Sequence, residues 1–141
     1  MPTRTARTAW TGSLQEGSGQ VELSSSHVGT YDVSFPKRAA DDADGTTSPE
    51  ELIAAAHSSC FAMALSNGLA KGGHTDITLD TRADVTFQPG QGITGIKLTV
   101  RGSVPGLSAE QFAEFAEAAK AGCPVSQALA GTTITLDALL S

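Results

Sequence analysis

The residues best suited to chemistry in this sequence are its two cysteines, Cys60 and Cys123. They lie too far apart for a C-x-x-C motif, so only the fold can bring them together. A reducing cytosol does not keep a structural disulfide closed, and two cysteines there are buried bystanders, metal ligands or redox partners. The choice among these roles decides the function.

The two cysteines differ in their surroundings. Cys60 lies in the middle of an apolar segment, where a free cysteine is commonly a small buried side chain. A reactive thiol there would need a nearby cation, and Lys37 and Arg38 are the candidates. Cys123 directly precedes Pro124 at the expected start of a helix, and helix N-termini stabilise thiolates. The residues alone therefore favour Cys123 as the better thiolate.

The histidines suggest two further kinds of site. His57 lies three residues before Cys60 and could act as the base for a cysteine nucleophile, as in a hydrolase or acyl-transfer enzyme. A histidine in such a segment is more often a hydrogen-bonded core residue. His27, His57 and His74 show no spacing typical of zinc ligands, so we expect no metal site, and no motif indicates another cofactor.

The composition is that of an ordinary globular protein, with 40% hydrophobic and 17% charged residues among 141. We expect a single domain over residues 1–141, because no linker or repeat divides the chain. The net charge of −6 and the absence of a basic run disfavour nucleic acid and membrane surfaces as partners. No apolar stretch follows the first residues in the manner of a secretory signal, which favours a cytoplasmic protein.

The segment that begins at Ser48 carries the strongest helix signals. Ser48 can cap the helix, Pro49 takes its first position, and Glu51 completes a capping box. Apolar residues then occupy nearly all faces through Leu65. Polar residues interrupt the stretch 52–70, so we expect a buried helix and not a membrane span. In so small a domain, we expect a second chain to cover it.

The remaining pattern predicts strands and two further helices. The strands are expected at residues 5–10, 19–24, 30–35, 77–87, 93–100 and 132–136. Ser108 caps a helix that ends near Gly122, and a short helix begins at Cys123. This order predicts an α+β fold with antiparallel sheets packed around the long central helix.

Two motifs resemble those of the OsmC/Ohr family. Residues 48–65, SPEELIAAAHSSCFAMAL, resemble its central helix, and residues 119–126, AKAGCPVS, resemble its second cysteine motif. Residues 9–12 and 134–137 also match, so the resemblance spans the chain in order. His57 is similar to the OsmC branch, because the Ohr branch carries Gly-Tyr near this point.

The resemblance implies an intertwined homodimer that reduces organic hydroperoxides, and hydrogen peroxide more weakly, with a dithiol as reductant. It makes Cys60 the peroxidatic cysteine and Cys123 the resolving one, contrary to the order that the helix dipole suggests. Arg38 and Glu50 carry over as the charged pair that supports the thiolate. The loop 38–49 is longer than is usual, so Lys37 is a possible substitute for Arg38. The implied chemistry is a Cys60 sulfenic acid followed by a Cys60–Cys123 disulfide.

Helix geometry adds an expectation about Glu50. It precedes Cys60 by ten residues, which is about 15 Å along a continuous helix at 1.5 Å per residue. We therefore expect Glu50 to serve the Cys60 site across the dimer. Two other interpretations stay open at this point: a hydrolase that uses Cys60 and His57, and a non-enzymatic dimeric binding protein with two inert thiols.

Overall fold

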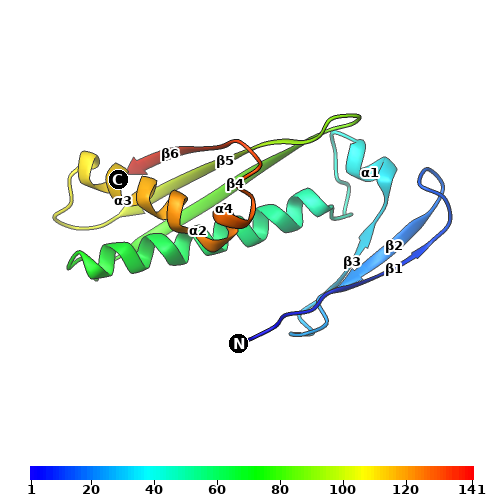
Figure 1. The fold of residues 1–141 in the computed structure, drawn as a ribbon, viewed down its shortest axis with the longest axis horizontal. Coiled ribbons are helices and arrows are strands. Elements are labelled where there is room, and N and C mark those ends of the chain that lie inside the picture. The colour runs from blue at the N-terminus through cyan, green and yellow to red at the C-terminus, as the bar shows by residue number, and fades with distance from the viewer. The chain divides into compact units, whose positions relative to one another are not determined.

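The computed structural model describes residues 1–141, and the chain forms two compact units, residues 1–52 and 53–141 (Figure 1). The N-terminal unit contains an antiparallel sheet in the order β1-β2-β3. Its strands are β1 (Arg7–Thr11), β2 (Ser18–Glu22) and β3 (Thr30–Val33). Most side chains of this sheet are exposed, and Val21 is its one buried hydrophobic residue.

A short helix, α1 (Phe35–Ala39), follows β3. The alternating pattern predicts a strand through residue 35, and that boundary is wrong by two residues, because β3 ends at Val33. The Ser34 hydroxyl accepts a hydrogen bond from the Lys37 N–H at 3.4 Å, and Pro36 lies in the first turn. A serine cap followed by proline is a helix-start signal that outweighs the alternation before it. Arg38 therefore lies on a helix and not in a loop.

The long helix α2 (Pro49–Lys71) begins where the sequence predicts and continues past Leu65. The Ser48 hydroxyl accepts a hydrogen bond from the Glu51 N–H at 3.1 Å. The Glu51 carboxylate, however, accepts from the Thr47 hydroxyl at 2.6 Å, so the return half of the predicted capping box is made with a neighbouring residue.

The C-terminal unit contains the second sheet, in the order β4-β5-β6. Strands β4 (Thr78–Gln88) and β5 (Gly92–Ser103) form the predicted antiparallel hairpin. The last strand, β6 (Ile134–Leu140), runs parallel to β5, which corrects the expectation of purely antiparallel sheets. The physical reason is the connection, because α3 (Ala109–Gly122) and α4 (Pro124–Ala128) form a helical crossover that returns the chain in its original direction.

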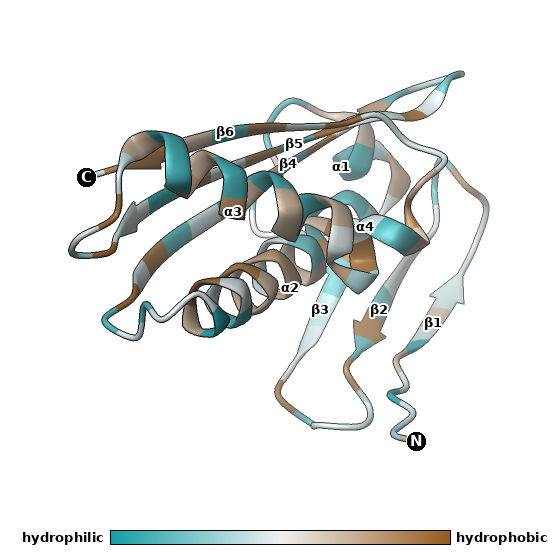
Figure 2. Ribbon diagram, turned by 60° about the vertical axis from the view of Figure 1, so that its left-hand side comes forward, coloured by the Kyte–Doolittle hydropathy of each residue, from teal (hydrophilic) through white to brown (hydrophobic).

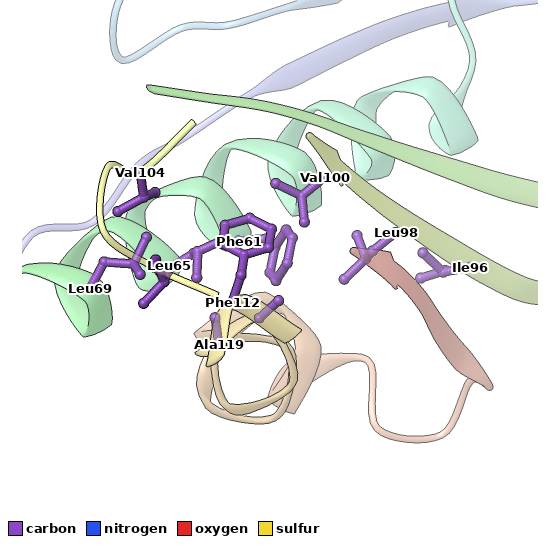
Figure 3. Packing of buried hydrophobic residues seen from close by; sticks show 11 residues of the cluster. Phe61, Leu65, Leu69, Ile96, Leu98, Val100, Val104, Phe112 and Ala119 are labelled. Carbon is purple, nitrogen blue, oxygen red and sulfur yellow. The ribbon is translucent and has the colours of Figure 1, made fainter. Parts of the chain in front are cut away.

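The core of the C-terminal unit lies between this sheet and two helices. Figures 1 and 2 show α2 and α3 on the same face of the sheet. Phe61 of α2 and Phe112 of α3 are fully buried and meet in the centre of the cluster, as Figure 3 shows. A Cβ atom at Gly102 of β5 would lie 2.5 Å from the Phe112 ring, so only glycine allows this close approach.

One stripe of α2 faces this core. His57, Phe61, Leu65 and Leu69 are fully buried and recur every four residues. The opposite side is open, with Met63 72% exposed. By length and composition α2 is apolar enough to cross a membrane, a property that core helices of soluble proteins share, and 22% of its most apolar stretch is buried. A single chain therefore covers one side of the helix, and the prediction that a second chain covers the rest stays a prediction.

Candidate active site

The fold brings the two cysteines together in the C-terminal unit. Cys60 lies on the middle of α2, and Cys123 lies between α3 and α4. Their sulfur atoms are 2.8 Å apart, and both cysteines are free. Cys123 is fully buried, whereas Cys60 is partly exposed. A solute can therefore reach the Cys60 sulfur but not the Cys123 sulfur. Cys123 lies next to any product that forms on the Cys60 sulfur.

The position of Cys123 follows from the helix connection. Its N–H donates to the Ala119 carbonyl at 2.9 Å and ends α3, and its own carbonyl accepts from the Gln127 N–H at 3.0 Å in the first turn of α4. Pro124 fits the first position of α4, where no N–H is needed. One residue thus ends one helix and begins the next, which fixes its side chain toward α2.

Hydrogen bonds make the two thiols unequal. Burial raises the pKa of Cys60, and the hydrogen bond with Cys123 raises it further. Burial also acts to raise the pKa of Cys123, but the hydrogen bonds from Cys60, from the backbone of Val125 and Ser126, and from the Ser126 hydroxyl outweigh it and lower this pKa. The direction agrees with the sequence-based argument that Cys123 is the better thiolate.

His57 and Ser126 form a buried polar pair near the two cysteines in sequence. His57 Nε2 is 2.7 Å from the Ser126 hydroxyl oxygen, and both residues are buried. His57 Nδ1 is a buried side-chain atom without a hydrogen-bond partner. Burial lowers the pKa of His57, because the charged imidazolium is poorly solvated there. His57 is a candidate from the sequence alone, whereas Ser126 is not, because no motif marks it as a buried polar residue.

The charged pair of the prediction forms in the N-terminal unit. Arg38 of α1 binds Glu50, at the start of α2, through two nitrogens at distances of 2.7 to 3.1 Å. The Glu50 side chain is 8% exposed and that of Arg38 is 29% exposed. Such a bidentate pair holds the guanidinium in one orientation while leaving part of it accessible.

Lys37, the possible substitute for Arg38, has a different partner. Its ammonium lies 2.8 Å from the Asp44 carboxylate on the exposed surface. The hydrogen bond with Asp44 raises the pKa of Lys37 and lowers that of Asp44. Glu50 thus forms its ion pair with Arg38, whereas Lys37 forms its ion pair with Asp44 in the loop that follows α1.

An apolar cavity of about 250 Å³ adjoins Arg38 within the N-terminal unit. Trp10 and Leu14 line it from the first hairpin, and Phe35 and Leu52 line it from the two helices. A hydrophobic recess beside one guanidinium suits a ligand with an alkyl body and a polar end.

Comparisons with known proteins show the family to which the chain belongs. A family model described as OsmC-like protein matches residues 41–137. The chain belongs to the OsmC family. Peroxiredoxin OsmC of Escherichia coli (strain K12) is 42% identical over 131 residues, which cover 91% of this chain and 90% of that protein. The predicted enzyme class, a peroxidase, is confirmed by this relationship.

Solved structures of OsmC and Ohr proteins share the fold. An organic hydroperoxide resistance protein from Elizabethkingia anophelis matches with a TM-score of 0.66 and 26% identity, covering 100% of this chain and 96% of that one. The organic hydroperoxide resistance protein OhrB of Bacillus subtilis matches with a TM-score of 0.64 and 25% identity, covering 97% and 98%. The α+β fold class predicted from the sequence is thereby confirmed.

In this OsmC protein, the geometry gives little support to a Cys60–His57 hydrolase. His57 Nε2 bonds Ser126, and Nδ1 has no partner, so no hydrogen bond joins the imidazole to Cys60. A general base must lie within hydrogen-bond reach of the nucleophile that it activates. Cys60 instead has Cys123 as its neighbour, which a hydrolase would not need.

Proposed function

We propose that this protein is a thiol peroxidase that reduces organic hydroperoxides through a Cys60 sulfenic acid and a Cys60–Cys123 disulfide. The observation that carries the proposal is the pair of free thiols 2.8 Å apart, one partly exposed and one buried, in a member of the OsmC family. A peroxide can reach the Cys60 sulfur, and the Cys123 sulfur is close enough to react with the oxidised product.

The first step oxidises Cys60. Its thiolate attacks the distal oxygen of the hydroperoxide, the O–O bond breaks, and the sulfur becomes a sulfenic acid. The alkoxide that leaves takes up a proton and departs as an alcohol. Sulfur loses two electrons and the peroxide gains them. The electron balance of this step therefore needs no metal or organic cofactor.

The second step uses Cys123. Its sulfur attacks the Cys60 sulfenic sulfur, the S–O bond breaks, and hydroxide takes up a proton and leaves as water. The product is the Cys60–Cys123 disulfide. A dithiol reductant then reopens it by thiol–disulfide exchange and is itself oxidised to a disulfide.

Arg38 and Glu50 form the supporting pair in this proposal. The partly exposed Arg38 guanidinium would stabilise the Cys60 thiolate and polarise the peroxide, and Glu50 would orient it through the bidentate contact. Glu50 and Cys60 lie ten positions apart on the continuous helix α2, about 15 Å along its axis. We therefore propose a homodimer in which the pair of one chain serves the Cys60 site of the other.

The substrate class follows from the apolar cavity beside Arg38. Its volume of about 250 Å³ and its aromatic and aliphatic lining would hold an alkyl group while the guanidinium faces the peroxide. Hydrogen peroxide cannot use such a lining, so organic hydroperoxides are the better substrates. The proposed enzyme acts in the cytoplasm as a single functional domain over residues 1–141.

A thiol titration tests this function directly. We expect two free thiols per chain before treatment and none after one equivalent of cumene hydroperoxide. A hydrolase would lose no thiols and would need no Cys123, and inert thiols would also survive. Parallel turnover assays with cumene hydroperoxide and hydrogen peroxide, each with a dithiol reductant, test the substrate preference, which equal rates would contradict.

A further inference from the structure

His57 and Ser126 form a buried hydrogen bond that the proposed reaction does not use. His57 Nε2 lies 2.7 Å from the Ser126 hydroxyl oxygen, and the two residues are 0% and 6% exposed. An apolar contact tolerates small shifts, whereas buried polar groups that separate lose their partner and the free energy of the bond. The pair therefore favours one position of α4 relative to α2.

The short helix α4 depends on this bond for its anchoring. It has five residues, and a helix of this length is marginal by itself. Ser126 is its one buried residue, and no side chain caps its first turn. In contrast, α3 is held by the buried residues Phe112, Ala116 and Ala119. Of the two helices that meet at Cys123, α4 is thus the one whose position rests on a polar contact.

The two cysteines lie one helical turn from this bond. His57 precedes Cys60 by three residues on α2, and Ser126 follows Cys123 by three residues at the start of α4. The Cys123 carbonyl accepts from the Gln127 N–H at 3.0 Å, so Cys123 belongs to the first turn of α4. Residues three apart lie on the same side of a helix. The two contacts, one between His57 and Ser126 and one between the sulfurs, therefore join the same two segments.

We propose that the His57–Ser126 hydrogen bond anchors α4 to α2 and thereby sets the separation of the Cys60 and Cys123 sulfurs. Both are positioning residues, since they act through the helices and not on the peroxide. The inference rests on the proposed function for the step that it serves, in which the Cys123 sulfur attacks the Cys60 sulfenic sulfur and water leaves. A sulfur held in place reacts at a higher effective concentration than one on a loosely attached helix.

The direction of the bond follows from the other ring nitrogen. His57 Nδ1 is buried and has no partner. Orphaned buried N–H donors are rarer than under-satisfied acceptors, so Nδ1 is the unprotonated nitrogen and Nε2–H donates to the Ser126 oxygen. Burial lowers the pKa of His57, which favours this neutral form of the ring. A glutamine amide at position 57 can donate in the same way.

The redox equilibrium of the cysteine pair tests the anchoring. The full-length protein is equilibrated with mixtures of reduced and oxidised glutathione, and the disulfide fraction is measured by alkylation and mass spectrometry. Ser126→Ala and His57→Leu should each lower the effective concentration of Cys123 at Cys60 by about 3- to 10-fold, the contribution of one hydrogen bond. The disulfide potential should rise by about 15–30 mV, since a tenfold change corresponds to about 30 mV.

Matched variants separate this role from packing. Ser126→Thr keeps the hydroxyl and His57→Gln keeps a donor, so both should return the potential close to the parental value. Thr81→Val is the control, because it removes a different hydrogen bond to α2, from the Thr81 hydroxyl to the Ser58 carbonyl at 2.9 Å. That bond joins α2 to β4 and not to α4, so the potential should not change.

A folded Ser126→Ala protein with the parental potential would overturn the proposal, and so would an equal shift in Thr81→Val. After one equivalent of cumene hydroperoxide, Ser126→Ala should form the sulfenic acid at the parental rate and the disulfide more slowly. The glutathione equilibrium needs no peroxide, so a failure of the proposed function would appear only in this second measurement.

Discussion

The two pairs of predicted site residues lie in regions that are built very differently. The Cys60–Cys123 pair belongs to a unit with a closed core of its own, centred on Phe61 and Phe112. The Arg38–Glu50 pair belongs to a unit in which Val21 is the one buried hydrophobic residue. Side-chain packing in the C-terminal unit therefore fixes the positions of the two sulfur atoms. The positions of Arg38 and Glu50 depend more on their hydrogen bonds to each other and on a partner that covers the exposed first sheet.

The largest expected effect concerns the pair with the closed core. Cys60→Ser should abolish peroxide reduction, because Cys123, the one remaining thiol, is fully buried. Cys123→Ser should keep one turnover and accumulate a Cys60 sulfenic acid, which a dimedone adduct detects by mass spectrometry. If Cys60→Ser keeps its activity while Cys123→Ser loses the first turnover, the lower pKa of Cys123 marks the peroxidatic residue and the proposed roles are reversed.

The charged pair should matter less than the nucleophile but still strongly. Removing one preorganised donor from a reacting centre commonly costs about 100-fold in rate, so we expect a loss of this order for Arg38→Ala. Lys37→Ala is the matched control and should cost far less, because Lys37 pairs with Asp44. Equal losses in steady-state peroxidase assays would show that Lys37 shares the role.

Mixed dimers sharpen the same comparison by asking which chain supplies the pair. A heterodimer of a Glu50→Ala chain and a Cys60→Ser chain should keep one complete site and show about half of wild-type activity if the sites are composite across two chains. Each mutant homodimer is the control. A heterodimer as inactive as its parents would place both residues at a site within one chain.

The exposed side of α2 and the thinly packed first sheet predict that the folded protein is a dimer. Sedimentation at micromolar concentration should show one dimeric species, and dilution should lower the thermal midpoint, because the second chain supplies missing burial. A stable folded monomer over this range would contradict the prediction and leave the N-terminal unit without an explanation for its exposed apolar residues.

Core substitutions should separate the two units in stability. Phe61→Ala removes a fully buried ring and should cost about 3–5 kcal/mol of unfolding free energy. Val21→Ala removes two methyl groups and should cost about 1.5 kcal/mol. Urea titrations of both variants measure the difference. Equal costs would show that the N-terminal unit is packed as tightly as the other.

The smallest expected effect is a pH dependence of stability from His57. Burial lowers its pKa in the folded chain, so the unfolded chain binds more protons as the pH falls below about 6.5, the ordinary histidine pKa. Its contribution to stability is complete above that pH and decreases as the pH falls toward the folded-state pKa. Denaturation of His57→Gln at several pH values should lack this component, and an unchanged slope would contradict the assignment.

The sequence predicted much of the fold from local signals. Ser48 and Ser108 mark helix starts correctly, and alternation located the hairpin of β4 and β5. The direction of β6 was missed, because period-two alternation gives no information on whether a neighbouring strand is parallel. The helix containing Arg38 differs from the prediction because the Ser34 cap outweighs the strand pattern that precedes it.

The candidate site was predicted unevenly. Cys60, Cys123, Arg38 and Glu50 were named from motifs, and the structure pairs each with its expected neighbour. The sequence does not single out Ser126, because a serine inside a short helix has many possible environments. Only tertiary packing, which brings α4 against the buried stripe of α2, shows that it meets His57.

The close approach of the two sulfurs also bears on the protein's resistance to its own substrate. A Cys60 sulfenic acid faces two competing fates, condensation with Cys123 or further oxidation to sulfinic acid by a second peroxide molecule. A group held 2.8 Å away acts at an effective concentration far above that of any dissolved peroxide. Condensation should therefore win over a wide range of oxidant doses, and inactivation should become appreciable only when the reductant no longer keeps Cys123 reduced.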